Sequence, residues 1–155
     1  MRYDIFTDGS CKGNPGPGGY AFVVTVSNST EQKIIYEYSG GELKTTNNRM
    51  ELLSIIKALT YAKNKLLKKD KDAHIRIFSD SEYCVNGINK RWIKKWIGNG
   101  WKTSNGGDVV NKDLWEKINS LDKEIDFQII KVKAHADNIF NNRCDELAKL
   151  KCNIK

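Results

Sequence analysis

Four acidic residues stand at positions where an α/β fold would bring their carboxylates together. Asp8 and Asp80 each follow a short apolar segment, whereas Glu51 and Asp145 lie early in segments with helical periodicity. A bare carboxylate is costly to bury, so each of these groups must be paired, hydrogen-bonded or bound to a cation. We therefore treat all four as candidate metal ligands.

Each acid also has a purely structural explanation. An Asp-Gly pair such as the one at Asp8 is typical of a hairpin turn, and Asp80 could favour the start of a helix through the helix dipole. Glu51 and Asp145 each lie three residues after an asparagine, which is the spacing of a helix-capping box. These explanations are adequate one at a time, but they do not explain why four acids would converge in one fold.

Converging carboxylates point to a particular metal chemistry. They repel one another strongly at low dielectric, and bound cations make the arrangement favourable. Ligation by oxygen alone selects hard ions, so Mg²⁺ is expected, with Mn²⁺ as a substitute, rather than Zn²⁺. Two such ions about 3.5–4 Å apart are the usual device for in-line attack on a phosphodiester. His135 is either an exposed histidine in a polar loop or a mobile group that transfers protons and aids product release.

The periodicity of the apolar residues predicts an α/β fold with a five-stranded mixed sheet flanked by helices. The expected strands lie at about 3–6, 20–26, 33–39, 74–78 and 126–132, and the expected helices at about 49–67, 81–87, 89–97, 111–121 and 142–151. The glycine pair at 40–41 is expected to end the third strand, and Asn141 or Asn142 to cap the last helix. Right-handed crossovers would make the fourth and fifth strands parallel to the first. Asp8 and Asp80 would then meet at the carboxyl edge of the sheet, where ligands bind in open α/β sheets.

Composition restricts the class of protein. A chain of 155 residues with 39% hydrophobic residues is expected to form one domain, 1–155. No apolar run is long enough to span a bilayer, and the N-terminus does not resemble a signal peptide. The four scattered cysteines indicate free thiols in a reducing compartment, so we expect a cytoplasmic protein. We also expect a monomer without a membrane partner.

The charge distribution favours a polyanionic partner. The net charge is +7, and the segment 83–107 contains no acidic residue. A basic protrusion is therefore expected at about 89–107, where Trp92, Trp96 and Trp101 are interleaved with lysines. Cations bind phosphates, and exposed aromatic rings pack on sugars and bases. An amphipathic helix facing the core would account for one or two of these tryptophans but not for all three.

Six stretches of the sequence together resemble the type 1 ribonuclease H family. They are residues 7–19, 45–52, 79–81, 101–103, 133–136 and 142–148. The resemblance implies a ribonuclease H-like fold and an endoribonuclease that cleaves the RNA strand of RNA–DNA hybrids. It also implies a two-metal-ion mechanism that leaves 5′-phosphate and 3′-hydroxyl ends. Matched by position, the metal-binding catalytic acids are Asp8, Glu51, Asp80 and Asp145, and the auxiliary catalytic histidine is His135.

The same resemblance implies several groups of nucleic-acid contacts. Residues that match the lining of the minor groove are Cys11, Asn14, Asn47 and Asn48. Those that match a pocket for one DNA phosphate are Lys44, Thr46 and Asn111, and those that pack on the DNA strand are Tyr83 and Trp92. The basic protrusion contributes Lys90, Arg91, Lys94, Lys95 and Trp96.

Two departures from the family pattern add acidic residues. Asp137 stands where many relatives have glycine, and Glu82 places a further acid beside Asp80.

One alternative function is a hybrid-binding module without catalysis, but four intact acids argue against it. The other is a nuclease, resolvase or recombinase of the same fold superfamily. The glycine loop and the basic tryptophan segment argue against that alternative.

Overall fold

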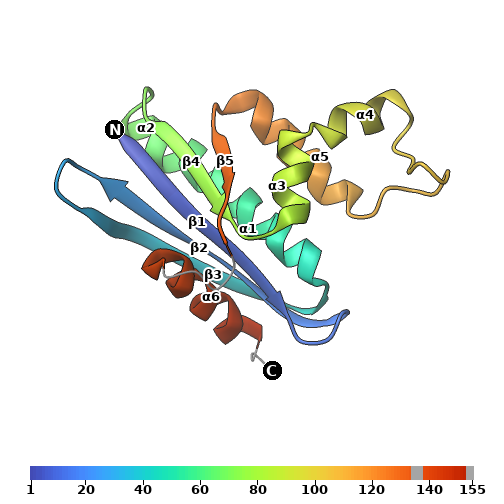
Figure 1. Ribbon diagram of the computed structural model, residues 1–155, viewed down its shortest axis with the longest axis horizontal. Coiled ribbons are helices and arrows are strands. Elements are labelled where there is room, and N and C mark those ends of the chain that lie inside the picture. The colour runs from blue at the N-terminus through green and yellow to red at the C-terminus, as the bar shows by residue number, and fades with distance from the viewer. Residues whose placement is uncertain (134–137, 153–155) are drawn as a thin grey trace.

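A twisted five-stranded mixed sheet forms the centre of the computed structural model, which describes residues 1–133 and 138–152 (Figure 1). The strands are β1 (Arg2–Cys11), β2 (Gly16–Ser27), β3 (Gln32–Thr45), β4 (His74–Ser79) and β5 (Gln128–Lys131), in the order β3-β2-β1-β4-β5. The first three are antiparallel, whereas β4 is parallel to β1 and β5 is parallel to β4. The predicted fold class and strand directions are therefore confirmed.

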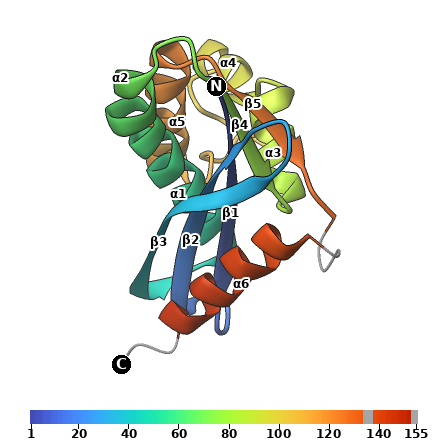
Figure 2. The same ribbon diagram turned by 90° about the vertical axis from the view of Figure 1, so that its left-hand side faces the viewer.

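Helices cover both faces of the sheet, but unequally (Figure 2). They are α1 (Asn47–Tyr61), which continues through a π-helical turn η1 (Ala62–Leu66) into α2 (Leu67–Lys69), then α3 (Glu82–Asn89), α4 (Trp92–Gly98), α5 (Lys112–Glu124) and α6 (Ile139–Cys152). Strand alternation divides the side chains of β1 between two clusters: Ile5 joins the large core with α1 and α5, and Phe6 joins the smaller core with α6. None of the helices in the described residues is long and apolar enough to cross a bilayer.

The prediction that the glycine pair ends the third strand was wrong, because β3 continues to Thr45. Gly40 and Gly41 pair with Tyr20 and Gly19 of β2. A Cβ at Gly40 would lie 2.4 Å from the hydroxyl oxygen of Tyr20. The pair therefore makes room for a neighbouring ring instead of breaking the strand.

The predicted cap of the last helix was also wrong. α6 begins at Ile139, and the side-chain oxygen of Asn138 accepts hydrogen bonds from the N–H groups of Phe140 and Asn141 at 2.9 and 3.1 Å. The cap is thus three residues upstream of Asn141, the nearer of the two predicted caps. Asp145 consequently lies beyond the first turn of α6 and is not in a capping-box position.

Candidate metal centre and nucleic-acid interface

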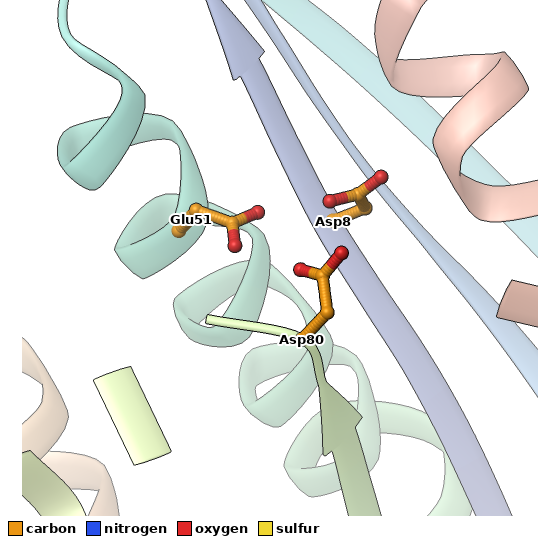
Figure 3. A group of neighbouring side chains, drawn as sticks. All are labelled: Asp8, Glu51 and Asp80. Carbon is orange, nitrogen blue, oxygen red and sulfur yellow. The ribbon is translucent and has the colours of Figure 1, made fainter. Parts of the chain in front are cut away.

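Three carboxylates from three different elements meet at the carboxyl edge of the sheet (Figure 3). One oxygen each of Asp8 in β1, Glu51 in α1 and Asp80 directly after β4 lies within 4.8 Å of the other two. Asp8 and Glu51 are buried, and Asp80 is partly buried. Such a group of oxygens can hold a hard divalent cation.

The backbone explains why these side chains meet. Phe6 of β1 pairs with Phe78 of β4 in the parallel register, so Asp8 and Asp80, each two residues further on, reach the same level. Gly9 makes room for the start of α1, because a Cβ there would lie 2.4 Å from the backbone nitrogen of Glu51. The N–H of Gly9 in turn donates a hydrogen bond to the Glu51 carboxylate.

The structural explanations for Asp8 and Glu51 fail, and Asp80 is not the cap of its helix. Asp8 pairs with Ala21 inside β1 rather than forming a turn, since the chain reverses only at residues 12–15. The N-cap of α1 is Thr46, and the N-cap of α3 is Ser81, whose hydroxyl accepts a hydrogen bond from the Cys84 N–H at 3.2 Å. Neither Glu51 nor Asp80 therefore serves as a helix cap.

Asp145 adjoins the three acids without belonging to the same close group. It lies in α6 beside Asp8, to which it is near enough to hydrogen-bond. Its Oδ2 pairs with the Lys149 ammonium at 3.0 Å, one turn along the helix. The sequence predicted four converging ligands, and the described residues bring three together with the fourth alongside. The predicted role of His135 concerns a residue outside the described part of the chain.

Electrostatics at the site favours a cation. Burial, a hydrogen bond with Asp145 and the charge of Asp80 raise the pKa of Asp8 to about 8. Burial and the charges of Asp8 and Asp80 raise the pKa of Glu51 well above its ordinary value. The neighbouring Cys144 thiol donates to the backbone oxygens of Phe6 and Ala21 at 3.3 and 3.2 Å. The thiol is therefore engaged elsewhere, and the atoms available as metal ligands are carboxylate oxygens, which fit Mg²⁺ or Mn²⁺.

Polar residues of the predicted groove surround the start of α1. Asn14 accepts a hydrogen bond from the backbone N–H of Asn47 at 3.1 Å, which joins the turn at 12–15 to the helix. The Cys11 thiol donates to the backbone oxygen of Thr45 at 3.3 Å. Lys44 and Asn48 are exposed on the same segment. The structure thus places these predicted groove residues around the start of α1, the helix that carries Glu51.

The tryptophans of the basic protrusion form one aromatic cluster with Trp115 of α5. The ring centroid of Trp96 lies 5.9 Å from that of Trp92, 5.7 Å from that of Trp101 and 5.5 Å from that of Trp115. All are partly or fully buried against the main core. Packing therefore accounts for all three tryptophans, contrary to the expectation from sequence. The exposed features of this segment are its cations, Lys90, Arg91, Lys94 and Lys95.

Sequence reasoning missed three residues that organise this interface. Arg49 pairs with Asp113, and the indole of Trp115 donates to the hydroxyl of Tyr83 at 2.9 Å. Arg49 lies inside a motif that carried the family resemblance, which is the signal that could have drawn attention to it. Asp113 and Trp115 have no comparable signal, because their partners are distant in sequence.

Comparison with known proteins places the chain in a family. The family model described as RNase H matches residues 1–153. A ribonuclease H of Acetivibrio thermocellus is 45% identical over 95% of this chain and 92% of its own, and one of Chlorobium phaeovibrioides is 46% identical over 96% and 94%. The crystal structure of LC9-RNase H1, described as a type 1 RNase H with the type 2 active-site motif, has a TM-score of 0.81 at 27% identity, covering 97% of this chain and 72% of that one. The chain belongs to the ribonuclease H family.

Proposed function

We propose that this protein is an endoribonuclease that hydrolyses the RNA strand of RNA–DNA hybrids and leaves 5′-phosphate and 3′-hydroxyl ends. The observation that carries the proposal is the group of three carboxylates within 4.8 Å at the carboxyl edge of the sheet. The family and the relatives named ribonuclease H support the substrate class. In addition, LC11-RNase H1, which has the same fold at 24% identity and a TM-score of 0.70, was crystallised with an RNA/DNA hybrid.

The proposed cofactor is a pair of Mg²⁺ ions held by Asp8, Glu51 and Asp80, with Asp145 alongside. Ions held there would supply the chemistry of a two-metal site, which is orientation of the phosphodiester, activation of the attacking water and stabilisation of charge on the leaving 3′ oxygen. The strand ends fix Asp8 and Asp80, and the Gly9 N–H holds Glu51, so the ligands are organised in advance.

Protons must leave the acids when cations bind, because Asp8 and Glu51 have raised pKa values. In this proposal His135 transfers protons or aids product release, and Asp145 completes the set of catalytic acids. The hybrid is the proposed partner, and a monomer is the proposed state of the protein. The four free thiols support a cytoplasmic location.

A labelled RNA–DNA hybrid tests the function directly. With the protein and a chelator, the RNA is expected to stay intact, and adding Mg²⁺ or Mn²⁺ should produce fragments that a ligase can rejoin. Cleavage that resists chelation would contradict the metal centre. Tight binding without cleavage at any divalent concentration would instead support the hybrid-binding module.

The basic protrusion is expected to contribute phosphate contacts. Replacing all four of its exposed cations, Lys90, Arg91, Lys94 and Lys95, with glutamine should weaken hybrid binding and reduce its salt dependence. Each lost contact should lower the slope of log Kd against log salt by about 0.7–0.9. Binding measured between low and moderate salt gives this slope.

A matched control changes the net charge equally at a different surface. Four exposed lysines lie at or near η1 and α2, beside the opposite end of the sheet from the acids: Lys65, Lys68, Lys69 and Lys71. Replacing them with glutamine should leave the slope close to that of the unmodified protein. Equal slopes for the two variants would show that the protrusion does not contact phosphates.

A further inference from the structure

A charged clamp connects the helix that carries Glu51 to the start of α5. The guanidinium of Arg49 forms two parallel hydrogen bonds with the carboxylate of Asp113, at 2.9 Å from Nη1 and 2.8 Å from Nη2. Nη1 also donates to the side-chain oxygen of Asn111 at 3.2 Å. A fork of this kind fixes direction as well as distance, which a single ammonium group would not do.

The clamp determines which way the Asn111 amide faces. A guanidinium has donors only, so the amide oxygen must face Arg49 and the Nδ2 group must face away. Nδ2 accordingly donates to the hydroxyl oxygen of Tyr83 at 3.3 Å. That oxygen also accepts from the indole N–H of Trp115 at 2.9 Å, and an indole likewise can only donate.

This chain of hydrogen bonds leaves three donor hydrogens available for a ligand. Tyr83 accepts two bonds, so its hydroxyl proton is free to donate elsewhere, and one hydrogen of Asn111 Nδ2 has no acceptor within the described residues. The backbone N–H of Arg49 donates to the hydroxyl oxygen of Thr46 at 3.3 Å, which likewise leaves the Thr46 proton available. Arg49 thus contacts two of the three residues proposed to hold one DNA phosphate.

We infer that Arg49, held by Asp113, is a positioning residue that fixes the Asn111 amide with its N–H groups toward the phosphate of the DNA strand. A flipped amide would present its oxygen, which is an acceptor, to an anion and would repel it. Because Asp113 neutralises the Arg49 charge, the effect comes from orientation rather than from attraction. The inference rests on the proposed hybrid substrate.

The variant Asp113→Asn separates orientation from charge. It removes a negative charge near a polyanion, so electrostatics alone predicts a lower KM for the hybrid. Loss of the clamp predicts the opposite, a KM raised about tenfold, equivalent to ~1.4 kcal/mol, with kcat changed less than twofold. The side chain of Asp113 is 60% exposed, so the change should not unfold the protein. A lowered or unchanged KM would overturn the inference.

Glu124→Gln provides the matched control. Glu124 at the end of α5 pairs with Lys63 in η1, so this ion pair also joins the α1 side of the molecule to α5, at the other end. The change in charge is the same as in Asp113→Asn. The KM of Glu124→Gln for the hybrid should stay at or below that of the unmodified protein. A KM raised equally by both variants would mean that any loss of an α5 ion pair has this effect, which overturns the inference.

A double-mutant cycle then tests the link to Asn111. Asn111 has a backbone φ of 66°, so Asn111→Gly is the conservative truncation. In that background Asp113→Asn should add less than twofold to KM, because the amide to be oriented is gone. Full additivity would overturn the inference. Hybrids with a single methylphosphonate moved along the DNA strand should show one position that raises KM, and Asp113→Asn should abolish that sensitivity.

The outcomes distinguish a failure of this inference from a failure of the proposed function. No cleavage of any hybrid by the unmodified protein would refute the proposed function. Normal cleavage with no sensitive methylphosphonate position would refute the phosphate grip and overturn the inference with it. A sensitive position that persists unchanged in Asp113→Asn would overturn the role of Arg49 alone.

Discussion

Replacing Asp8 or Asp80 with asparagine is expected to reduce hybrid cleavage about 10³-fold or more, because several kcal/mol of transition-state stabilisation depend on cation ligation. Asparagine is nearly isosteric with aspartate, but its neutral amide is a weak ligand for a hard cation. Both side chains lie in the group of three within 4.8 Å, so each loss removes a ligand from the same site. Single-turnover cleavage of a labelled hybrid in excess Mg²⁺ measures the effect.

The same variants should keep the fold, and Asp8→Asn should gain stability at neutral pH. The folded pKa of Asp8, about 8, lies above its ordinary value, so folding takes up a proton. Stability from such a group is present below the unfolded pKa and is lost as pH rises toward the folded value. Without divalent cations, the unmodified protein should therefore lose stability from about pH 4 to pH 8. Asp8→Asn should show a flatter profile and be about 1–3 kcal/mol more stable at pH 7.

Urea unfolding in chelator at pH 5 and pH 8 provides this comparison. Adding Mg²⁺ at pH 8 should stabilise the unmodified protein more than Asp8→Asn, because ligand binding to the folded state raises stability. Asp126→Asn, at an exposed acid just before β5, serves as the control and should cleave normally. Cleavage by Asp8→Asn within tenfold of the unmodified protein would refute the assignment of the metal centre.

The sequence predicted the sheet and the meeting of Asp8 with Asp80 at its edge, because local patterns determine both. Parallel pairing of two short apolar strands is enough to bring Asp8 and Asp80 together. Two of the failed predictions depend on tertiary contacts. Gly40 leaves room for the ring of Tyr20, and Trp92 and Trp96 pack on Trp115, which lies in another helix. No periodicity or propensity carries that information.

The residues of the proposed nucleic-acid interface came from the family resemblance, but the hydrogen bonds that orient them were not predicted. Asn111 and Tyr83 matched family positions, whereas the bonds that orient them come from Arg49 and Trp115. These partners are separated by up to 62 residues, and only the folded chain brings them together. The α6 cap is a different case, since three nearby asparagines offered competing caps and the sequence could not choose among them.

Strand and sugar specificity must come from contacts away from the metal centre, because any nucleic acid supplies a phosphodiester. The 2′-hydroxyl distinguishes RNA from DNA at a given site. On the cleaved strand, the polar groups around the turn at 12–15 and the start of α1 are proposed to meet 2′-hydroxyls and base edges. Asn14 and Asn47 are exposed there and linked to each other at 3.1 Å.

The other strand should be selected for deoxyribose. Thr46 and Asn111 are proposed to hold one of its phosphates, with Lys44 nearby. Tyr83 and Trp92, whose ring centroids lie 5.8 Å apart, are proposed to pack on adjacent sugars. A deoxy sugar has no 2′-hydroxyl to bury against an aromatic ring, where an unpaired hydroxyl would be costly. A DNA duplex should therefore fail on the first strand, and an RNA duplex should fail on the second.

We expect endonucleolytic cuts only in the RNA of a hybrid, within runs of several ribonucleotides. An RNA duplex and single-stranded RNA should be cleaved more slowly than the hybrid by a factor of about 100 or greater. Misplacement of a phosphodiester by 1 Å has an effect of this size. Gel analysis of a hybrid, an RNA duplex, a DNA duplex and single-stranded RNA, each with Mg²⁺, measures the four rates. Comparable cleavage of the RNA duplex would refute this account of specificity. Fragments that end in a 2′,3′-cyclic phosphate would refute the chemistry, because they require attack by the 2′-hydroxyl instead of water.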